Sequence, residues 1–231
     1  MIEELEKLID MIEDEELRKL VREFVSKPDT KLGKEGFPLE EGPGGISMHH
    51  AYPGGLLQHT VATTKIALSL CDVVEEVYGW NVNRDIVIAA AVLHDVGKLF
   101  TYNLTEEGYE KSDIGLKFDH LTLAMMELYS RKFPPEVLHA VLSHHGDQSP
   151  TTPKTIEALI VSVADYADST LNGKVIRAAR YLAKKAVEEV ELKQLTPEQA
   201  YEIIKAKKEQ GMEGVKKTVE KLLEAGEAAE I

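Results

Sequence analysis

The sequence predicts a protein built from helices, and two observations carry this prediction. Residues 86–93 are an unbroken run of Ile, Val, Ala and Leu, which is typical of a buried helix because no position offers a polar face to solvent. Residues 5–24 and 137–145 place apolar side chains at spacings of three, four and seven, the period at which one helix face points into a core. Helices are therefore expected along most of the chain.

The N-terminal 26 residues predict one amphipathic helix or a pair of helices, ended by Pro28. Their polar face is mainly acidic, so anionic lipid would repel it and a role at a membrane surface is disfavoured. Residues 27–55 then hold too many Gly and Pro for regular structure. A loop of this length in a compact domain is usually functional or disordered.

Two helices are predicted to deliver polar side chains into the interior. In the helix expected over residues 56–78, His59 shares a face with apolar residues, so it points where the core points. Asn83 is a plausible N-cap for the next helix, which is expected to end at His94 and Asp95. Burying an imidazole beside a carboxylate is costly unless the two are paired, hydrogen-bonded or bound to a metal.

Further His and Asp residues sit on or at the end of later predicted helices. Residues 100–118 show no helical period and are expected to form a short hairpin or a lid. Asp119 then reads as an N-cap that places His120 in a first helical turn, and the stripe after Pro135 includes both His144 and His145.

The last predicted helices carry two aspartates, Asp165 and Asp168, and are followed by a C-terminal segment that is expected mainly to pack. Asp165 lies on a helix expected over about 154–171, with Asp168 one turn later on the same side. From Gly173 onward two or three amphipathic helices are expected, with a break at Gly211. Alternating Lys and Glu mark a solvated face there, so a packing or homo-oligomer role is the default for this segment.

Composition narrows the class of protein. The chain has 231 residues, 27 Lys and Arg against 40 Asp and Glu, and a net charge of −13. Basic residues are interspersed with acids and form no stripe, which argues against a long nucleic-acid partner without excluding a short one. With one cysteine, Cys71, no internal disulfide is expected. No run of 18 apolar residues and no signal peptide are found, so we expect a cytoplasmic protein.

The simplest interpretation of a buried His-Asp pair is a capping or hydrogen-bonded pair, and the remaining histidines favour a metal instead. The ordered set His59, His94-Asp95, His120, His144 and Asp165 resembles that of the HD-domain metal-dependent phosphohydrolases, in the version that holds two metals. The resemblance covers roughly residues 45 to 175. It implies an all-α HD-domain helical bundle with additional N- and C-terminal helices, at about 1–44 and 176–231, in a single domain.

The same resemblance implies a distribution of ligands. The first metal would be held by four side chains and the second by two, with one carboxylate bridging: His59, His94, Asp95 and Asp165 for the first, His120 and His144 for the second, and Asp95 shared. His145 is expected to act as a ligand, or as a catalytic or phosphate-facing group. Lys98 is expected to contact phosphate, because a flexible point charge beside a metal suits an anionic oxygen.

The segment His49-His50-Ala51-Tyr52-Pro53-Gly54-Gly55 resembles the stretch that lies at the mouth of the metal site in HD relatives. His50 and Tyr52 are thus candidate substrate contacts. The alternative is that they merely pack on the domain. With the motifs around His120 and His144, this segment resembles archaeal HD phosphodiesterases that act on the 2',3'-cyclic phosphate of dihydroneopterin and depend on iron. Similar motifs occur in bacterial 3'-5' exoribonucleases.

Mixed imidazole and carboxylate ligands suit Fe²⁺ or Mn²⁺, with Zn²⁺, Co²⁺ and Ni²⁺ as further candidates, better than Ca²⁺ or Mg²⁺. Two such ions about 3.5 to 4 Å apart clamp a phosphate and activate hydroxide. The sequence therefore predicts a metal-dependent phosphodiesterase acting on a small cyclic phosphate, such as a pterin or nucleotide. The alternatives are an exoribonuclease, a nucleotide phosphatase, and a nucleotide-binding regulatory module without catalysis.

Overall fold

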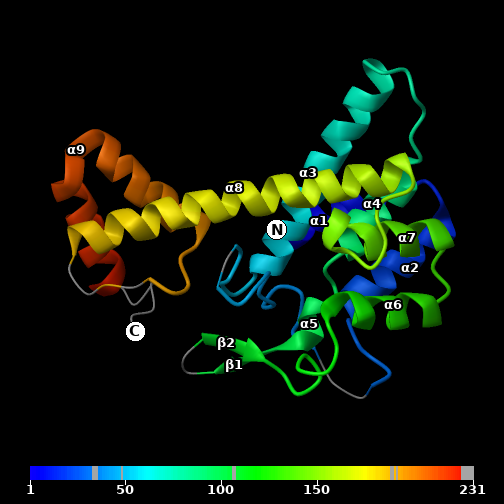
Figure 1. The fold of residues 1–231 in the computed structure, drawn as a ribbon, viewed down its shortest axis with the longest axis horizontal. Helices are drawn as coiled ribbons and strands as arrows, with labels where there is room; N and C mark the ends of the chain where they lie inside the picture. Colours follow the sequence, from blue (N-terminus) through cyan, green and yellow to red (C-terminus); the bar gives the residue numbers. More distant parts are fainter. Residues whose placement is uncertain (33–35, 48, 106–107, 188–189, 191, 225–231) are drawn as a thin grey trace.

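The computed structural model describes residues 1–32, 36–47, 49–105, 108–187, 190 and 192–224. Their regular secondary structure is helical apart from one two-stranded hairpin, which confirms the all-α prediction (Figure 1). The helices are, in chain order, α1 (Ile2–Asp10), α2 (Glu15–Ser26), α3 (Gly55–Glu76), α4 (Arg84–Leu93), α5 (Lys98–Thr101), α6 (His120–Ser130), α7 (Pro135–Ser143), α8 (Ile156–Ala186) and α9 (Pro197–Glu224).

Two apolar cores share the long helix α8 (Figure 1). The larger core is built by α1 to α7 and the first half of α8, and its buried run over residues 86–93 of α4 lies at its centre. The smaller core starts at Ile176 in the second half of α8 and is closed by α9. Helix α8 runs through both cores without a break, so we propose that the chain forms the single domain that the sequence predicts. No helix in the described part of the chain is long and apolar enough to span a membrane.

The expected caps fix where the site-bearing helices begin. The side chain of Asn83 accepts a hydrogen bond from the Ile86 N–H at 3.3 Å, and that of Asp119 accepts one from the Thr122 N–H at 2.7 Å. Such bonds satisfy backbone donors that a first helical turn leaves unpaired. His120 therefore stands as the first residue of α6.

The loop between α2 and α3 has no helix or strand among its described residues, as expected from its Gly and Pro content. It folds back over the larger core, where the Phe37 N–H donates to Leu99 O at 3.0 Å and the Leu56 N–H donates to Gly42 O at 3.0 Å. The hairpin of β1 (Tyr102–Thr105) and β2 (Gly108–Lys111) is antiparallel. Of the two alternatives expected for residues 100–118, a short hairpin or a lid, the described residues form the hairpin.

Two helix ends differ from the sequence prediction. The helix expected to reach Asp95 ends at Leu93, and His94 is its C-cap. The helix expected to end near residue 171 continues to Ala186. A glycine inside a helix, here Gly173, costs only about 1 kcal/mol relative to alanine, and burial of the following apolar residues in the smaller core offsets that cost. The break expected at Gly211 is present, with φ at 69° inside α9.

The turn after α4 brings the HD pair against the start of α6. A Cβ added at Gly97 would meet the backbone oxygen of His120 at 2.0 Å, whereas one added at Gly173 would find its nearest atom at 3.9 Å. We expect Gly97→Ala to lower the free energy of unfolding by about 1–3 kcal/mol through overpacking. Gly173→Ala, the matched control, should be neutral or stabilising by up to about 1 kcal/mol. Urea denaturation of both metal-free variants tests this, and equal stability of the Gly97 variant and the parent would refute it.

Candidate metal centre

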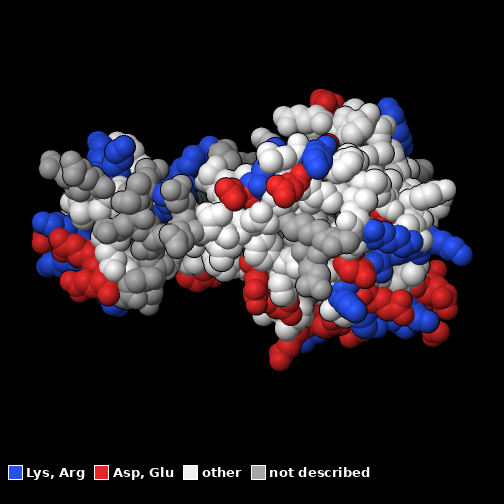
Figure 2. All heavy atoms as spheres, turned by 90° about the horizontal axis from the view of Figure 1, so that it is seen from below, with Lys and Arg blue, Asp and Glu red and all other residues white. Residues whose placement is uncertain are grey.

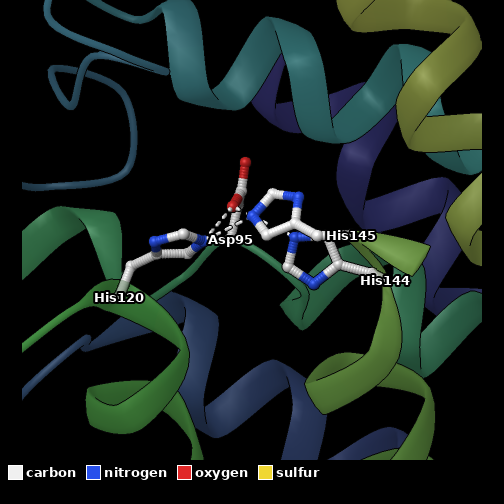
Figure 3. Close-up of side chains that lie close together, drawn as sticks. All are labelled: Asp95, His120, His144 and His145. Carbon is white, nitrogen blue, oxygen red and sulfur yellow. Dashed lines mark hydrogen bonds and ion pairs between the residues drawn. The ribbon is translucent and has the colours of Figure 1, made fainter. Parts of the chain in front are cut away.

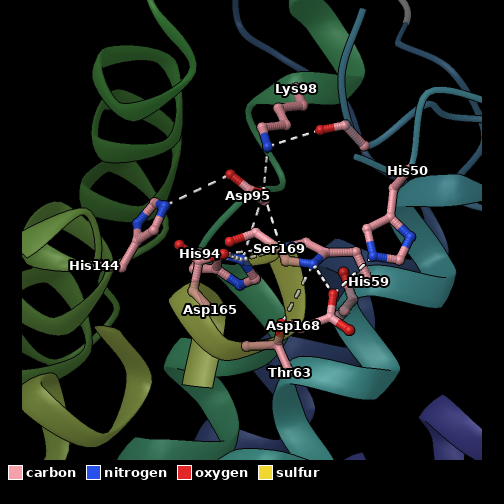
Figure 4. A network of polar contacts seen from close by, with 12 residues as sticks. His50, His59, Thr63, His94, Asp95, Lys98, His144, Asp165, Asp168 and Ser169 are labelled. Carbon is pink, nitrogen blue, oxygen red and sulfur yellow. Dashed lines mark hydrogen bonds and ion pairs between the residues drawn. The ribbon is translucent and has the colours of Figure 1, made fainter. Parts of the chain in front are cut away.

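The predicted site residues come together where α3, α4, α6, α7 and α8 meet (Figures 3 and 4). His59 lies on the core face of α3 and is 0% exposed, while Asp95 follows α4 and is 1% exposed. Helix α8 supplies Asp165, which is buried as well. A carboxylate with so little access to water has lost its hydration, and only hydrogen bonds or a cation can compensate.

Four of these side chains form a first group of donor atoms that lie within 4.8 Å of one another. Nε2 of His59 stands 3.0 Å from Nε2 of His94, 3.3 Å from Oδ2 of Asp95 and 3.2 Å from Oδ1 of Asp165. Figure 4 shows these side chains converging from α3, α4 and α8. This group consists of the side chains expected for the first metal.

A second group lies on the other side of Asp95 (Figure 3). Oδ1 of Asp95 is 3.3 Å from Nε2 of His120 and 3.6 Å from Nε2 of His144. His145 joins this group, because its Nε2 is 3.1 Å from Nε2 of His120. Asp95 thus offers one oxygen to each group, the arrangement expected of a bridging carboxylate.

The tautomers of the histidines fit a metal in the first group. Nδ1 of His94 lies 2.8 Å from the carbonyl oxygen of Ala91, so Nδ1 carries the proton and Nε2 keeps a lone pair. Nδ1 of His59 is held in the same way by Asp168 Oδ2 at 2.6 Å. Two lone pairs facing each other at 3.0 Å repel unless a cation or a proton stands between them. The spacing suits two nitrogens, each about 2.1 Å from one ion.

The second group contains polar atoms that protein contacts leave unsatisfied. Oδ1 of Asp95 and Nε2 of His144 are buried and have no hydrogen-bond partner among the residues that the structure describes. Nδ1 of His144 donates to Val141 O at 2.7 Å, so its Nε2 is again a lone pair. Each such buried atom costs about 1–3 kcal/mol. A divalent ion satisfies both atoms, so the donor set fits a metal here too.

The pKa shifts follow from burial and from the shared negative charge. Burial lowers the pKa of His94 and of His120 to about 3, so both rings are neutral, the form that ligates a metal. Burial also opposes protonation of His59, but its hydrogen bonds to Asp165, Asp168 and Asp95 outweigh burial and hold its pKa well above the ordinary value. A proton on Nε2 of His59 thus takes the position that a metal ion would fill.

The two aspartates of the groups remain ionised despite their burial. For Asp95, burial acts to raise the pKa, but Lys98 and His94 outweigh it and the pKa lies well below its usual range. For Asp165, burial is likewise overcome by hydrogen bonds to His145 and His59. Both carboxylates therefore present negative oxygens to the space between the imidazoles.

Lys98 reaches Asp95 although α4 does not continue through the HD pair. Its Nζ donates to Asp95 Oδ2 at 2.6 Å and to Gly44 O at 2.8 Å, and the residue is 7% exposed. Burial alone would lower the pKa of Lys98, but Asp95 raises it above the ordinary value, so the side chain is a fixed ammonium. An ammonium has three donors, and one remains for another oxygen.

His50 and Tyr52, the expected substrate contacts, are 2% and 4% exposed. Nε2 of His50 is 2.7 Å from Asp168 Oδ2, and Nδ1 is 2.8 Å from the Tyr52 hydroxyl, which donates to Gln58. A single oxygen of Asp168, Oδ2, therefore contacts both Nε2 of His50 and Nδ1 of His59. The structure thus links His50 directly, and Tyr52 through His50, to the carboxylate that also contacts His59.

The neighbouring His49 is a residue that sequence reasoning passed over. Its ring centroid lies 5.7 Å from that of His59, and its Nδ1 is buried and finds no hydrogen-bond partner in the described part of the chain. Burial lowers the pKa of His49 to about 4. The sequence signal was present in the His49-His50 pair, but in a loop without periodicity nothing distinguishes which of two adjacent rings faces the protein interior.

Residues 56–170 match the model of the HD domain family. Over 225 residues the chain is 45% identical to the dihydroneopterin 2',3'-cyclic phosphate phosphodiesterase of Methanocaldococcus jannaschii, covering 95% of this chain and 88% of that protein. The chain belongs to the HD-domain family of metal-dependent phosphohydrolases. The resemblance predicted from the sequence is confirmed, and with it an enzyme that uses a divalent metal.

Other HD relatives are longer proteins. The chain is 30% identical over 184 residues to the 3'-5' exoribonuclease YhaM of Oceanobacillus iheyensis, covering 74% of this chain and 54% of that protein. It is 29% identical over 140 residues to the YhaM exoribonuclease of Bacillus subtilis, with coverages of 56% and 43%. The chain thus spans about half the length of these exoribonucleases. No solved structure matches it.

The bridging position of Asp95 in the HD site leads to a prediction about metal content. Asp95→Asn keeps the shape but removes the negative charge shared by both groups, so we expect loss of bound metal and of turnover. Chelation should lower the melting temperature of the metal-loaded parent, because a ligand of the folded state stabilises it, and should leave that of the variant unchanged. Elemental analysis and thermal melts measure both effects. Asp113→Asn, at an exposed carboxylate, is the control, and a metal-loaded, active Asp95 variant would contradict the prediction.

A second prediction concerns the carboxylate that orients His59. Asp168→Asn retains the size of the side chain but weakens the hold on the Nδ1 proton of His59, so metal affinity should fall by about 10- to 100-fold. Competition with a metal-sensitive dye gives the affinity, again with Asp113→Asn as control. Unchanged affinity would show that the contact between Asp168 and His59 does not support the site.

Proposed function

We propose that the protein is a phosphodiesterase that opens small 2',3'-cyclic phosphates, such as those of a pterin or a nucleoside. The observation that carries the proposal is the pair of donor groups sharing Asp95. The similarity to a dihydroneopterin 2',3'-cyclic phosphate phosphodiesterase over 95% of this chain supports the substrate class. Water adds to phosphorus, one ester bond to the diol breaks, and the released oxygen takes a proton, leaving a monophosphate.

The proposal includes two metal ions, Fe²⁺ or Mn²⁺, with Zn²⁺, Co²⁺ or Ni²⁺ as further candidates. His59, His94, Asp95 and Asp165 would hold the first, and Asp95, His120 and His144 would hold the second. When bound, such ions supply Lewis acidity toward phosphate oxygens and lower the pKa of water. The contribution of the chain is a preorganised set of neutral imidazoles and ionised carboxylates.

Two residues at the edge of the donor groups are assigned to the phosphate. Lys98 keeps one ammonium donor beyond its bonds to Asp95 and Gly44, and it can bind a non-bridging phosphate oxygen. The side chain of His145 is 33% exposed, against 0% for that of His144, so His145 is the member of the second group that substrate can approach. His50 and Tyr52 act as positioning residues through Asp168.

Exoribonuclease activity is the second candidate, since the YhaM exoribonucleases match 56% to 74% of the chain. Charge disfavours it: acidic and basic side chains intermingle on the face shown in Figure 2, and the net charge of −13 repels a polyanion. A silent regulatory module is disfavoured by the donor set, because each side chain of the first group is aimed at one shared space.

Turnover of an adenosine 2',3'-cyclic phosphate by protein loaded anaerobically with Fe²⁺, and in parallel with Mn²⁺, tests the proposal. We expect adenosine 2'- or 3'-monophosphate as product by chromatography, little hydrolysis of the 3',5'-cyclic isomer, and none with Asp95→Asn.

Other outcomes would replace the proposal. Release of nucleotides from the 3' end of RNA, with cyclic phosphates untouched, would establish an exoribonuclease. Nucleotide binding by metal-loaded protein without turnover of either substrate would establish a regulatory module.

A further inference from the structure

His49 lies beside the first donor group without belonging to it. A ring nitrogen of His49 lies within 4.8 Å of a ring nitrogen of His59, and the two ring centroids are 5.7 Å apart. The four side chains of the first donor group nevertheless form a set that does not include His49. Nδ1 of His49 is buried, and it has no hydrogen-bond partner among the described residues. A buried polar atom without a partner is costly to the folded state, so this nitrogen favours a partner that the chain itself does not supply.

Charged groups of the metal centre act on His49 from close by. Burial is the largest cause of its pKa of about 4, the next causes are the positive charges of Lys98 and His59, and Asp95 acts in the opposite direction. Electrostatic influence decreases with distance, so these causes place His49 near the ammonium group of Lys98. This is the ammonium that keeps one donor for another oxygen. His49 and Lys98 therefore border the same part of the centre.

The backbone at His50 makes the two adjacent histidine rings diverge. His50 has a φ of 51°, in the left-handed region that residues other than glycine seldom adopt. Its ring contacts Asp168 (Figure 4), and its plane stands at 83° to the plane of the His49 ring. Residues held in sparsely populated conformations cluster at active sites, where the surrounding structure maintains them. The conformation of His50 thus separates a ring that supports His59 through Asp168 from the ring of His49, whose Nδ1 is available to another molecule.

The loop that carries His49 is anchored on both sides of this residue. Nζ of Lys98 donates to Gly44 O at 2.8 Å, and the Gly44 N–H donates to His50 O at 2.8 Å. The His50 N–H in turn donates to Asn172 Oδ1 at 3.0 Å. A Cβ added at Gly44 would meet Cβ of His50 at 2.6 Å, so the loop is closely packed at this point. A side chain on a loop held in this way is preorganised for binding.

A third metal ion does not account for His49. One nitrogen each of His49, His50 and His59 lie within 4.8 Å of one another, but the nitrogens of the other two rings are engaged. Those of His50 contact Asp168 and Tyr52. Nδ1 of His59 contacts Asp168 as well, and its Nε2 belongs to the first donor group. An ion at this position would have to replace these hydrogen bonds, so Nδ1 of His49 better suits a hydrogen-bond acceptor on a bound molecule.

We propose that Nδ1 of His49 donates a hydrogen bond to a phosphate oxygen of the substrate, next to the oxygen held by Lys98. This inference rests on the proposed function and adds a substrate contact to it. A phosphate oxygen is a charged acceptor, so the bond is stronger than one between neutral groups, and it also satisfies the buried nitrogen. Of the two adjacent histidines, His49 thus contacts the substrate, whereas His50 positions His59 through Asp168.

Binding of inorganic phosphate to protein loaded with Mn²⁺ tests the inference without requiring turnover. The amide nitrogen of His49→Asn can occupy the position of Nδ1, whereas that of His49→Gln lies one bond further from the backbone. By calorimetry we expect the Asn variant to bind within about threefold of the parent and the Gln variant at least about tenfold more weakly, the effect of losing a hydrogen bond to a charged group. His139→Gln is the matched control and should keep the parental affinity, because the His139 ring accepts the Lys154 N–H outside both donor groups.

Elemental analysis of the same variants distinguishes a phosphate contact from a metal ligand. We expect both His49 variants to hold as much metal as the parent. A lower metal content in His49→Gln would make His49 a ligand and overturn the inference. If circular dichroism shows that His49→Gln does not fold, His49→Ala replaces it, since it removes the ring without adding length and carries the same expectations.

The outcomes separate this inference from the proposed function. Equal phosphate affinity in the parent and in His49→Gln overturns the contact even if cyclic phosphates are hydrolysed. An equal loss of affinity in His49→Asn and His49→Gln overturns it as well, because the whole ring and not its Nδ1 donor is then required. A phosphate affinity that follows the Nδ1 donor, without hydrolysis of adenosine 2',3'-cyclic phosphate, establishes the contact and rejects the phosphodiesterase.

Discussion

The burial of the Asp95 carboxylate is the constraint on which the rest of the structure depends. At 1% exposure this group has almost no water, and its oxygens face opposite sets of imidazoles. Keeping it ionised requires cations nearby, and the described part of the chain supplies Lys98 and, without a metal, the protonated ring of His59. The remaining charge has to come from what the site binds. Polar side chains on or next to α3, α4, α6, α7 and α8 reach this one carboxylate, and the apolar residues of α4 pack into the core beside it.

Much of this arrangement could be predicted from the sequence, because helical periodicity reports which side chains point inward. His59 and His144 share faces with apolar neighbours, and both are found buried. Asp119 marked the start of α6 and so the position of His120. The ligand assignment itself came from the family pattern and stays a prediction, although the distances place those side chains in two compact groups.

The parts that could not be predicted lie where periodicity is absent or where long-range packing overrides a local signal. His49 and His50 are adjacent in a loop, and His50 turns inward to contacts with Asp168 and Asn172, 118 and 122 residues further along the chain. Gly173 is locally a helix breaker, yet α8 passes through it because residues on both sides pack into different cores. Neither outcome is encoded within a window of a few residues.

Because the two cores share α8, the enzyme has two parts of unequal stability. Asp165 and Asp168 lie in the half of the helix that packs against the larger core, whereas Arg177 and Arg180 lie in the half held by the smaller core and α9. Local opening transitions start where the fewest apolar contacts must be broken. When the smaller core melts first, α8 frays only as far as that core extends. The donor groups of the metal centre, which lie in the larger core, then stay assembled after the smaller core has opened.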